Sequence, residues 1–448
     1  MLLTLKIAIL FYIFISINAR HLPPNITQIN LLSQNITKKQ DQEYNNLITS
    51  SLPKIYGVNL GGWLVTEPWI TPSIYEHIEK KYGILPIDEY NLCKILGKVK
   101  AKQYLTTHYE TFYNENDIEK ISKLGLNLIR IPIGYWAFGL LEKDPYIQGQ
   151  EYYLDLAVKW SLQYNLKFQI VLHGLPGSQN CFDNSGQKCL KPNWFEYDEN
   201  LTLTYKILDY IVDKYGNMTN IHSIEVVNEP MGWTLDEKKL KDFYNYCINL
   251  FKEKNIKANL VLSDAFFNLE HWYNFPGNFI LDHHLYEIFT DWQINYTFNE
   301  HINNIRSMSK RLKNTGHPSI VGEFSGAMDD CTKYLNGVGK GSRWEGNLES
   351  STLHPTTGKS CKNRDNPNLK LSKPFSKKLR YFLKEQFYNF EKFSYGWIFW
   401  CWKTESSLVW DMERLNDLNL LPKPLFNYRL NIKAEIEKNW VNFINNTN

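Results

Sequence analysis

The chain contains 448 residues, 43% of them hydrophobic and 22% charged, a composition typical of a globular protein. The formal charge of +3 at pH 7 is small and no long run of lysine or arginine occurs, which excludes the basic surface of a nucleic-acid-binding protein. A length of 448 residues exceeds that of most single domains, but one (β/α)8 barrel with insertions can use nearly all of it.

The first 19 residues have the pattern of a secretory signal peptide. Lys6 precedes an apolar run from Ile7 to Ile17, and Ala19 supplies the small residue expected before a cleavage site. The alternative is an uncleaved membrane anchor, but Lys6 interrupts the apolar run and a stable span needs about 20 apolar residues. We therefore expect a secreted protein that has no membrane partner once the signal is removed.

Residues 20–52 are polar and rich in Asn, Gln and Lys, without the periodicity of a helix or a strand. This composition predicts a disordered leader on the mature protein. We see no internal repeat and no second domain in the remainder, so residues 53–448 are expected to form one domain.

From residue 53 onward, short β-branched or aromatic runs alternate with longer amphipathic stretches, which is typical of repeated βα units around a parallel sheet. Eight strands are predicted, over residues 55–60, 127–133, 167–174, 223–229, 259–264, 278–286, 318–324 and 396–402. The intervals between most of them have room for a helix, for example 115–124 and 151–164. The predicted fold is α/β, a single (β/α)8 (TIM) barrel with extended loops at its C-terminal face.

The interval between Glu323 and Trp397 is longer than one helix requires. Its first half is rich in glycine and its second half in Ser, Thr and Pro, which indicates a loop inserted after the seventh strand. Insertions at the C-terminal face of a barrel help to build the active site. An ornamental surface loop is the equally weighted alternative.

Seven cysteines, an odd number, leave at least one thiol unpaired in an oxidising compartment. Cys401 lies in an apolar run and is the candidate for a buried free thiol. Cys331 with Cys361, and Cys181 with Cys189, are each close enough in sequence to close a loop, although spacing proves neither pair.

Six Asn-x-Ser/Thr sequons give independent support for secretion. They begin at Asn25, Asn35, Asn200, Asn217, Asn295 and Asn445. In a chain this rich in asparagine some of these sequons arise by chance, so we expect only part of them to carry glycans.

Polar residues end most of the predicted strands, where the C-terminal ends of barrel strands converge on one cup. They are Arg130, His173, Asn228 with Glu229, His284 with Tyr286, Glu323, and Trp400. One polar strand end is usually a satisfied core group, but six together indicate a site.

Glu229 and Glu323, at the predicted ends of strands four and seven, form the pair of carboxylates that glycosidic cleavage needs. Arg130 is expected to keep Glu323 ionised, and an apolar or hydrogen-bonded setting is expected to hold Glu229 protonated. If the enzyme retains configuration, the two carboxyl groups lie about 5 to 5.5 Å apart.

Asn228 is placed to bind a sugar hydroxyl, and His173, His284 and Tyr286 to orient carboxylates or hydroxyls, with structural packing as the alternative for each. A metal site is disfavoured because adjacent histidines such as His283 and His284 point to opposite faces of a strand. We expect no metal and no other cofactor. Three rings are candidate sugar-stacking platforms, with core packing as the alternative: Phe182, Phe289 and Trp400.

Several strings together resemble the fungal exo-1,3-β-glucanases (glucan 1,3-β-glucosidases) of glycoside hydrolase family 5. The strings are GVNLGGWLVTEPWITPSIYE, GLNLIRIPIGYWAF, LHGLPGSQNCFDNSG, VVNEP, DHHLYEIF, GEFSGAMDDCTKYLNGVGKGSRWEG and GWIFWCWKTE. The match runs from about Tyr56 to Trp402, and the PIGYWAF and GSQN-F-DNSG strings are the most specific.

The resemblance implies a retaining reaction that releases glucose from the non-reducing ends of β-1,3-glucan, in fungal cell-wall metabolism, with transglycosylation possible. It assigns Glu229 as acid/base and Glu323 as nucleophile, in a monomer located outside the cell or in its wall. It places around the terminal glucose Glu67, Arg130, His173, Asp183, Asn228, His284, Tyr286 and Trp400. Phe182 and Phe289 would clamp the next sugar.

The sequence departs from the family pattern at Cys181, where glycine is common, and at Ser325, where an aromatic residue is common. Cys331 and Cys361 match a family pair, whereas a bridge from Cys181 to Cys189 would be local to this chain. Two rival functions remain: an endo-acting or β-1,6-glucan hydrolase on the same barrel, and a glucan-binding wall protein without turnover.

Overall fold

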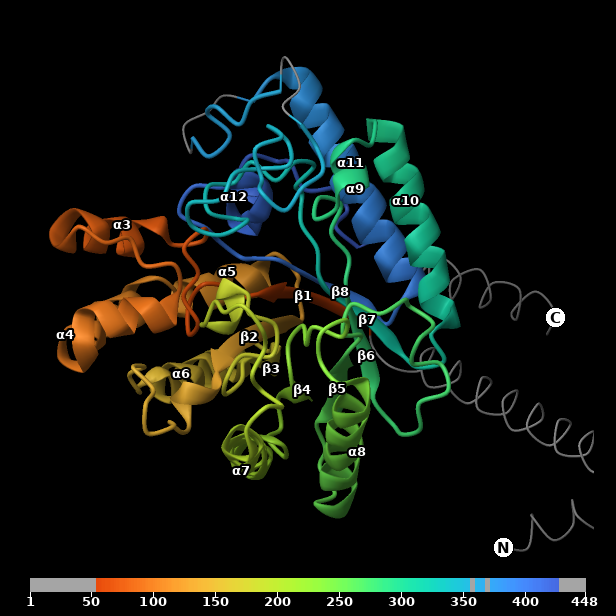
Figure 1. Cartoon of the computed structure of the whole chain (residues 1–448). Helices are drawn as coiled ribbons and strands as arrows, with labels where there is room; N and C mark the ends of the chain where they lie inside the picture. Colours follow the sequence, from red (N-terminus) through yellow and green to blue (C-terminus); the bar gives the residue numbers. More distant parts are fainter. Residues whose placement is uncertain (1–53, 355–358, 367–370, 427–448) are drawn as a thin grey trace, which may run out of the picture. The chain divides into compact units, whose positions relative to one another are not determined.

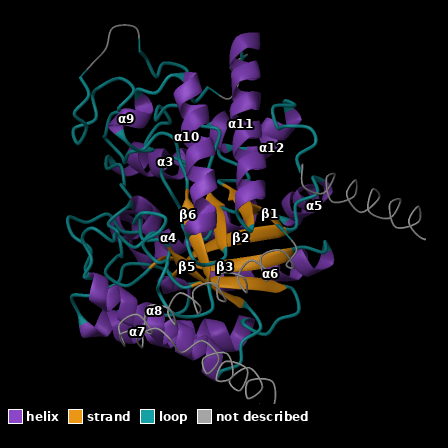
Figure 2. Cartoon of the chain, turned by 90° about the vertical axis from the view of Figure 1, so that its right-hand side faces the viewer, coloured by secondary structure: helices purple, strands orange, loops and turns teal. Residues whose placement is uncertain are grey.

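The computed structural model describes residues 54–354, 359–366 and 371–426. The expected signal peptide and leader, residues 1–52, lie outside this part of the chain. Within it, eight parallel strands pair in chain order and close into a barrel, with β8 returning to β1 (Figures 1 and 2). The predicted (β/α)8 architecture is confirmed.

The strands are β1 (Ile55–Asn59), β2 (Leu128–Gly134), β3 (Lys167–Gly174), β4 (Ile221–Glu225), β5 (Asn259–Ser263), β6 (Ile280–His284), β7 (Ser319–Glu323) and β8 (Gly396–Phe399). Most of them lie within a residue or two of the predicted runs. The fourth and eighth predicted strands were too long at their C-terminal ends. After Glu225 the chain turns, and Glu229 has the left-handed backbone angle φ 46°, which a strand cannot contain.

The barrel strands read as nearly continuous hydrophobic runs because both of their faces are buried. All seven residues of β2 are buried, and β2 pairs in parallel with β3 from Leu128 opposite Lys167 onward. Closure depends on a small residue at the start of β8, since a side-chain carbon on Gly396 would collide with the backbone of Ile55. The closed sheet gives the C-terminal strand ends fixed relative positions.

Helices surround the strands in the views of Figures 1 and 2. They are α3 (Pro72–Tyr82), α4 (Glu89–Thr111), α5 (Glu115–Lys123), α6 (Gln150–Gln163), α7 (Asp198–Tyr215), α8 (Glu237–Glu253), α9 (Asp291–Ile294), α10 (Phe298–Arg311), α11 (Lys373–Phe393) and α12 (Met412–Asp417). Single turns of 3-10 helix occur at η1 (Tyr135–Ala137), η2 (Asp183–Ser185), η3 (Leu312–Asn314) and η4 (Leu408–Trp410).

Helix starts are encoded locally. Helix α10 begins with a capping box in which Thr297 accepts from the backbone of Glu300 and Glu300 accepts from the backbone of Thr297. Helix α5 begins with the same arrangement between Asn114 and Asp117. Such a box satisfies two backbone donors that a helix N-terminus leaves unpaired, so the sequence fixes where these helices start.

Two disulfides tie down loops at the C-terminal face, and both are the pairs that the spacing allowed. Cys181–Cys189 closes the loop after β3, and Cys331–Cys361 closes part of the insertion between β7 and α11. Cys401 is free and buried as predicted, and two further buried thiols are free: Cys93 and Cys247.

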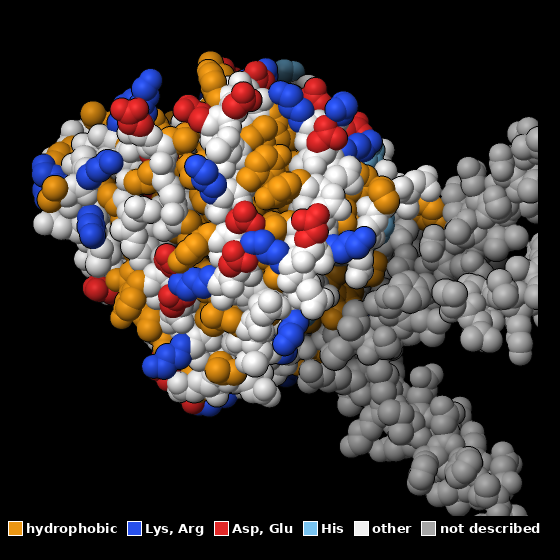
Figure 3. Space-filling model, turned by 90° about the horizontal axis from the view of Figure 1, so that it is seen from below, with side chains coloured by type: hydrophobic (Ala, Val, Ile, Leu, Met, Phe, Trp, Pro, Cys, Tyr) orange, Lys and Arg blue, Asp and Glu red, His pale blue; other side chains and the backbone are white. Residues whose placement is uncertain are grey.

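The surface carries mixed charge. On the face shown in Figure 3, basic and acidic side chains lie interspersed, with apolar side chains between them. No helix among the described residues is both long enough and apolar enough to cross a lipid bilayer.

Candidate active site

A pocket of about 710 Å³ opens where the strands end. Nine of the predicted site residues line it: Glu67, Phe182, Asp183, Glu229, His284, Tyr286, Phe289, Glu323 and Trp400. The other three, Arg130, His173 and Asn228, do not line the pocket but are almost fully buried beside residues that do. The structure therefore brings the predicted site together in two layers, one that lines the pocket and one that supports it.

Glu323 is the last residue of β7, and two donors hold its carboxylate. Arg130 donates from Nη1 to Oε1 at 2.8 Å, and the Tyr286 hydroxyl donates to Oε2 at 2.9 Å. With both oxygens hydrogen-bonded, the orientation of the carboxylate is fixed before any substrate arrives.

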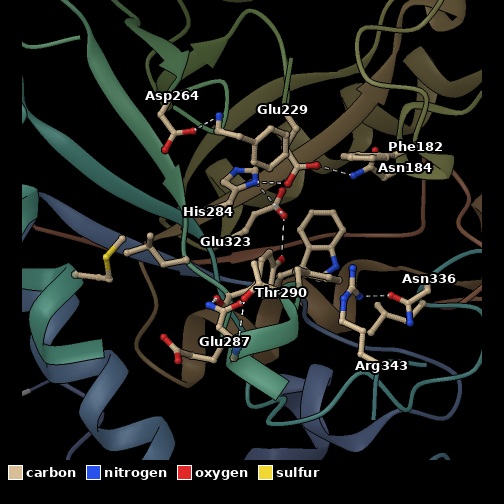
Figure 4. Close-up of a pocket in the computed structure, with 18 of the residues that line it drawn as sticks. Phe182, Asn184, Glu229, Asp264, His284, Glu287, Thr290, Glu323, Asn336 and Arg343 are labelled. Carbon is tan, nitrogen blue, oxygen red and sulfur yellow. Dashed lines mark hydrogen bonds and ion pairs between the residues drawn. The ribbon is translucent and has the colours of Figure 1, made fainter. Parts of the chain in front are cut away.

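Glu229 lies in the loop after β4 and also has two partners. His284 Nδ1 lies 2.7 Å from Oε1, and the Asn184 amide donates to Oε2 at 2.8 Å. Figure 4 shows the side chains of Glu229, His284 and Glu323 pointing toward one another, with Asn184 on the other side of Glu229.

The two glutamates are close. A carboxylate oxygen of Glu229, one of Glu323 and a ring nitrogen of His284 all lie within 4.8 Å of one another. Carboxyl groups about 5 to 5.5 Å apart are typical of retaining glycosidases, whereas inverting enzymes separate them by about 6.5 to 9.5 Å. The two carboxylates thus approach each other closely enough to act on one glycosidic bond.

His284 is surrounded by acidic groups. Burial alone would lower its pKa, but the neighbouring carboxylates of Glu323, Asp282 and Glu229 raise that pKa well above the usual value. These carboxylates favour the protonated ring, in which Nδ1 donates to Glu229.

The pKa directions in the unliganded protein oppose the expected sharing of the proton, in which Glu229 is protonated and Glu323 is ionised. Burial raises the pKa of Glu323, only partly opposed by the charges of His284 and Arg130. Burial also raises the pKa of Glu229, but the hydrogen bonds from His284 and Asn184 outweigh it and lower that pKa below its ordinary value. The hydrogen-bonded setting expected around Glu229 is present, but its donors, His284 and Asn184, stabilise the ionised carboxylate rather than the protonated one.

Arg130 is the centre of the supporting layer. Its Nε donates to Glu225 at 2.9 Å, and its Nη2 donates to Asn228 Oδ1 at 2.9 Å. Arg130 and Glu225 are fully buried, and each is compensated by the other. This network fixes Arg130 beneath Glu323. Glu225 was not predicted, since an acid inside a strand gives no signal until its partner is known.

Trp400 is supported by His173, whose ring stacks on the indole with centroids 5.4 Å apart. Burial lowers the pKa of His173 well below its usual value, so the ring is neutral. His283, by contrast, contacts Asp264 and Ser319 rather than the pocket. Adjacent histidines of β6 thus serve opposite faces, as expected.

Several buried polar atoms beside the pocket have no hydrogen-bond partner among the described residues. They are Glu67 Oε1, Asp183 Oδ2, Asn228 Nδ2 and both ring nitrogens of His173. Burial raises the pKa of Glu67 well above its usual value and that of Asp183 to about 6. Native proteins rarely leave such groups unpaired, and a ligand rich in hydroxyl groups would supply both donors and acceptors.

Aromatic rings edge the pocket. Phe182 is half-buried and Phe289 is 39% exposed, as clamp residues at a mouth should be. Six further rings that line the pocket were not predicted: Trp69, Trp233, Phe266, Phe267, Phe390 and Trp410. Trp69 and Trp410 meet edge to face at 4.9 Å and Trp410 also contacts Tyr286, so they form a wall on one side.

The insertion after β7 contributes to the pocket, so the ornamental alternative is wrong. Asn336 and Arg343 line it, and Arg343 donates to Asn336 Oδ1 at 3.0 Å (Figure 4). Asp330, which is buried, accepts from Arg343 in turn. Asn336 and Arg343 were not predicted as site residues, although both lie in the LNGVGKGSRWEG string.

Two clusters of side chains bring potential metal ligands together: Glu229, His284 and Glu323, and Glu225, Asp282 and His284. Both clusters include His284, which has no lone pair for an ion on a protonated nitrogen. Arg130 lies within 2.8 Å of Glu225 and of Glu323. The positive charge beside these carboxylates is therefore supplied by protein side chains.

A pair of buried carboxylates at the C-terminal face of a (β/α)8 barrel, beneath an aromatic-edged pocket with free polar atoms, defines the protein class as a glycoside hydrolase. The cellulase family profile (glycosyl hydrolase family 5) matches residues 96–344. The chain belongs to glycosyl hydrolase family 5.

Two fungal relatives match nearly the whole chain. It is 41% identical over 412 residues to the sporulation-specific glucan 1,3-β-glucosidase of Saccharomyces cerevisiae, covering 88% of this chain and 91% of the relative. It is 39% identical over 409 residues to glucan 1,3-β-glucosidase 2 of Candida albicans, covering 83% and 84%. Among solved structures, rutinosidase from Aspergillus niger matches with a TM-score of 0.64 at 20% identity, covering 82% of this chain and 97% of that one. The last match concerns the fold alone.

Proposed function

We propose that the protein hydrolyses β-1,3-glucan from the non-reducing end and releases glucose with retention of configuration. The observation that carries this proposal is the close pair Glu229 and Glu323 beneath the pocket. The names of the fungal relatives support the β-1,3 linkage.

In the first step Glu323 attacks the anomeric carbon as the nucleophile, and the bond from that carbon to the glycosidic oxygen breaks. Glu229, as the acid, gives its proton to the departing oxygen, so the aglycone leaves as a neutral alcohol. Arg130 and Tyr286 hold the attacking carboxylate in place.

The proton for this step has a source within the site. His284 is an imidazolium that donates to Glu229 at 2.7 Å. A sugar in the pocket displaces water and presents an oxygen that accepts a hydrogen bond only from protonated Glu229, and both effects favour transfer of the proton from His284. The low pKa of Glu229 therefore describes the protein before the sugar binds, not the complex in which the proton is transferred.

In the second step water attacks the glycosyl–Glu323 ester, and Glu229 removes the proton from that water. A sugar hydroxyl bound at the acceptor side can attack in place of water, which gives transglycosylation. Phe182 and Phe289 are placed at the pocket mouth to hold such an acceptor.

The exo mode is supported by the distribution of polar atoms. Glu67, Asp183 and Asn228 each have a buried polar atom without a hydrogen-bond partner, and Trp69 and Trp410, which form the aromatic wall, are buried as well. A terminal glucose has a free hydroxyl at each ring position remote from the scissile bond, and these hydroxyls match the unpartnered atoms.

We further propose that the protein acts outside the cell or in the wall, on wall glucan, as a monomer. Two disulfides in the described residues support an oxidising compartment.

The test is to incubate purified protein with β-1,3- and β-1,6-glucan, to follow products over time, and to record the anomer formed first by NMR. We expect glucose as the early product, in the β form, from β-1,3-glucan. Glu323→Gln, which preserves shape and removes the nucleophile, should lose at least about 1,000-fold in kcat.

Each contrary outcome has a meaning. A ladder of oligomers would replace the exo mode by endo action, and turnover of β-1,6-glucan alone would change the linkage. No product from either glucan, with binding retained, would identify a glucan-binding protein without turnover.

A further inference from the structure

Three of the six sequons begin within the described residues, at Asn200, Asn217 and Asn295, and their surroundings differ. Asn200 is 2% exposed and its side-chain amide nitrogen donates to the carbonyl of Asn193 at 2.8 Å. A sugar needs that nitrogen and the space around it, so the folded protein has no room for a glycan at Asn200.

Asn217 and Asn295 are both exposed. Asn217, between α7 and β4, accepts the backbone N–H of Lys257 through its side-chain oxygen. Asn295, at the C-terminal end of α9, accepts from Lys359 through its oxygen at 3.4 Å. In both residues the contact uses the oxygen, which leaves the amide nitrogen as the atom that faces modification.

Asn295 has a neighbour that fits a sugar. Trp292 lies three residues earlier and is 64% exposed, and the backbone N–H of Asn295 donates to the carbonyl of Trp292 at 3.1 Å. Residues three apart on a helical turn lie on the same side of it. An indole ring offers an apolar face to the C–H side of a sugar, so the first sugar on Asn295 would lie beside it.

We propose that Asn217 and Asn295 carry N-linked oligosaccharides, that Asn200 does not, and that Trp292 packs against the first sugar on Asn295. The modification joins the asparagine amide nitrogen to C1 of an oligosaccharide supplied on a lipid pyrophosphate. The bond from C1 to the pyrophosphate breaks, the pyrophosphate leaves with its electron pair, and the amide releases one proton. The proposal rests on the secretion proposed above.

Position gives the two glycans different consequences. Gln293, two residues before Asn295, and Phe289 both line the active-site pocket. Asn295 thus lies two residues along the chain from the pocket lining, at the end of α9, although residues two apart on a helical turn point to different sides. Asn217 precedes β4 and belongs to the opposite end of the barrel.

The test uses the full chain secreted from a yeast host. Treatment with a peptide N-glycosidase in ¹⁸O-labelled water converts each modified asparagine into labelled aspartate, which mass spectrometry locates after digestion. We expect label at positions 217 and 295 and none at 200. Label at Asn200 in folded protein, or its absence at Asn295, would overturn the assignment. Secretion without label at any site would overturn it while leaving the glucanase function standing, and failure of secretion would refute the location on which it rests.

The role of Trp292 is tested separately, in a background with Asn25→Gln, Asn35→Gln, Asn217→Gln and Asn445→Gln, which leaves the Asn295 sequon and the buried Asn200 sequon. Enzymatic removal of the Asn295 glycan should lower Tm by about 1–2 °C, the shift expected of one aromatic contact in a chain of this size. In Trp292→Ala the same treatment should leave Tm unchanged. Trp233→Ala is the matched control, since Trp233 is also 64% exposed but has no sequon beside it. Equal responses in all three proteins would refute the contact.

Discussion

The bridge between Cys181 and Cys189 closes a ring that contains four pocket residues, and its removal has a predictable cost. The two cysteines are eight residues apart. A disulfide lowers the entropy of the unfolded chain, which for a ring of this length stabilises the folded protein by about 2.5 kcal/mol. For the 30-residue separation of Cys331 and Cys361 the corresponding stabilisation is about 3.7 kcal/mol. We expect Cys181→Ala with Cys189→Ala to lower the free energy of unfolding in guanidinium chloride by about 2.5 kcal/mol, less than the corresponding change at the larger ring.

A second variant separates the effect of losing the disulfide from the effect of the backbone conformation at Cys181. Cys181 has φ 60°, a left-handed conformation that costs a non-glycine residue about 1 kcal/mol. Cys181→Gly with Cys189→Ala should therefore recover about 1 kcal/mol relative to the double alanine variant. If the glycine variant is no more stable than the alanine variant, the positive φ is not a source of strain.

The same ring holds Asn184 against Glu229 at 2.8 Å. A hydrogen bond to a charged group contributes about 1.5–3 kcal/mol. We expect removal of the bridge to cost about half of the contribution of the hydrogen bond from Asn184 to Glu229, and so to lower kcat/KM about tenfold. Asn184→Ala measured with and without the bridge completes a double-mutant cycle. The two changes should be strongly non-additive, and full additivity would show that the bridge does not act through Asn184.

Three further results are expected. Gly322→Ala should destabilise the protein by at least about 2 kcal/mol, because its new carbon would collide with the carboxylate of Asp282 on β6. Gly139→Ala, which meets the flexible end of a leucine side chain, is the control, and equal stability of the two variants would contradict the argument. Burial raises the pKa of Asp183 in the folded protein to about 6, above the ordinary value. Its contribution to the free energy of unfolding is therefore fully present below about pH 4 and is lost as the pH rises through 6. Relative to Asp183→Asn, the wild type should lose about 3 kcal/mol in denaturant titrations between pH 4 and 7, whereas parallel profiles would exclude this residue as the cause. His284→Gln should move the basic limb of the kcat/KM profile to lower pH because the proton reservoir is removed, and a move to higher pH would assign the resting proton to Glu229.

The sequence predicted the barrel well because parallel strands buried on both faces leave long hydrophobic runs, as in β3, whose predicted and observed bounds agree. It predicted where strands begin better than where they end. The fourth strand was predicted to reach Glu229 because VVNE continues the apolar pattern, but β4 ends at Glu225, and Glu229 beyond it has a left-handed backbone.

The catalytic pair was predictable because both glutamates follow apolar runs that a barrel forces together. Of the two donors to Glu229, His284 was expected to orient carboxylates or hydroxyls, whereas Asn184 was not predicted. They lie 55 and 45 residues away in sequence and reach Glu229 only through β6 and the folded loop. The direction of a pKa shift depends on those donors, so it could not be worked out from one charged neighbour.

The three buried free thiols, Cys93, Cys247 and Cys401, make opening of the folded protein measurable. Burial raises the pKa of each well above the usual value, so in the finished protein they are inert. In the unfolded chain they would compete with the four paired cysteines for every disulfide. In the native protein their burial shields them from a thiol reagent, so the rate at which such a reagent labels them reports how often the structure around them opens.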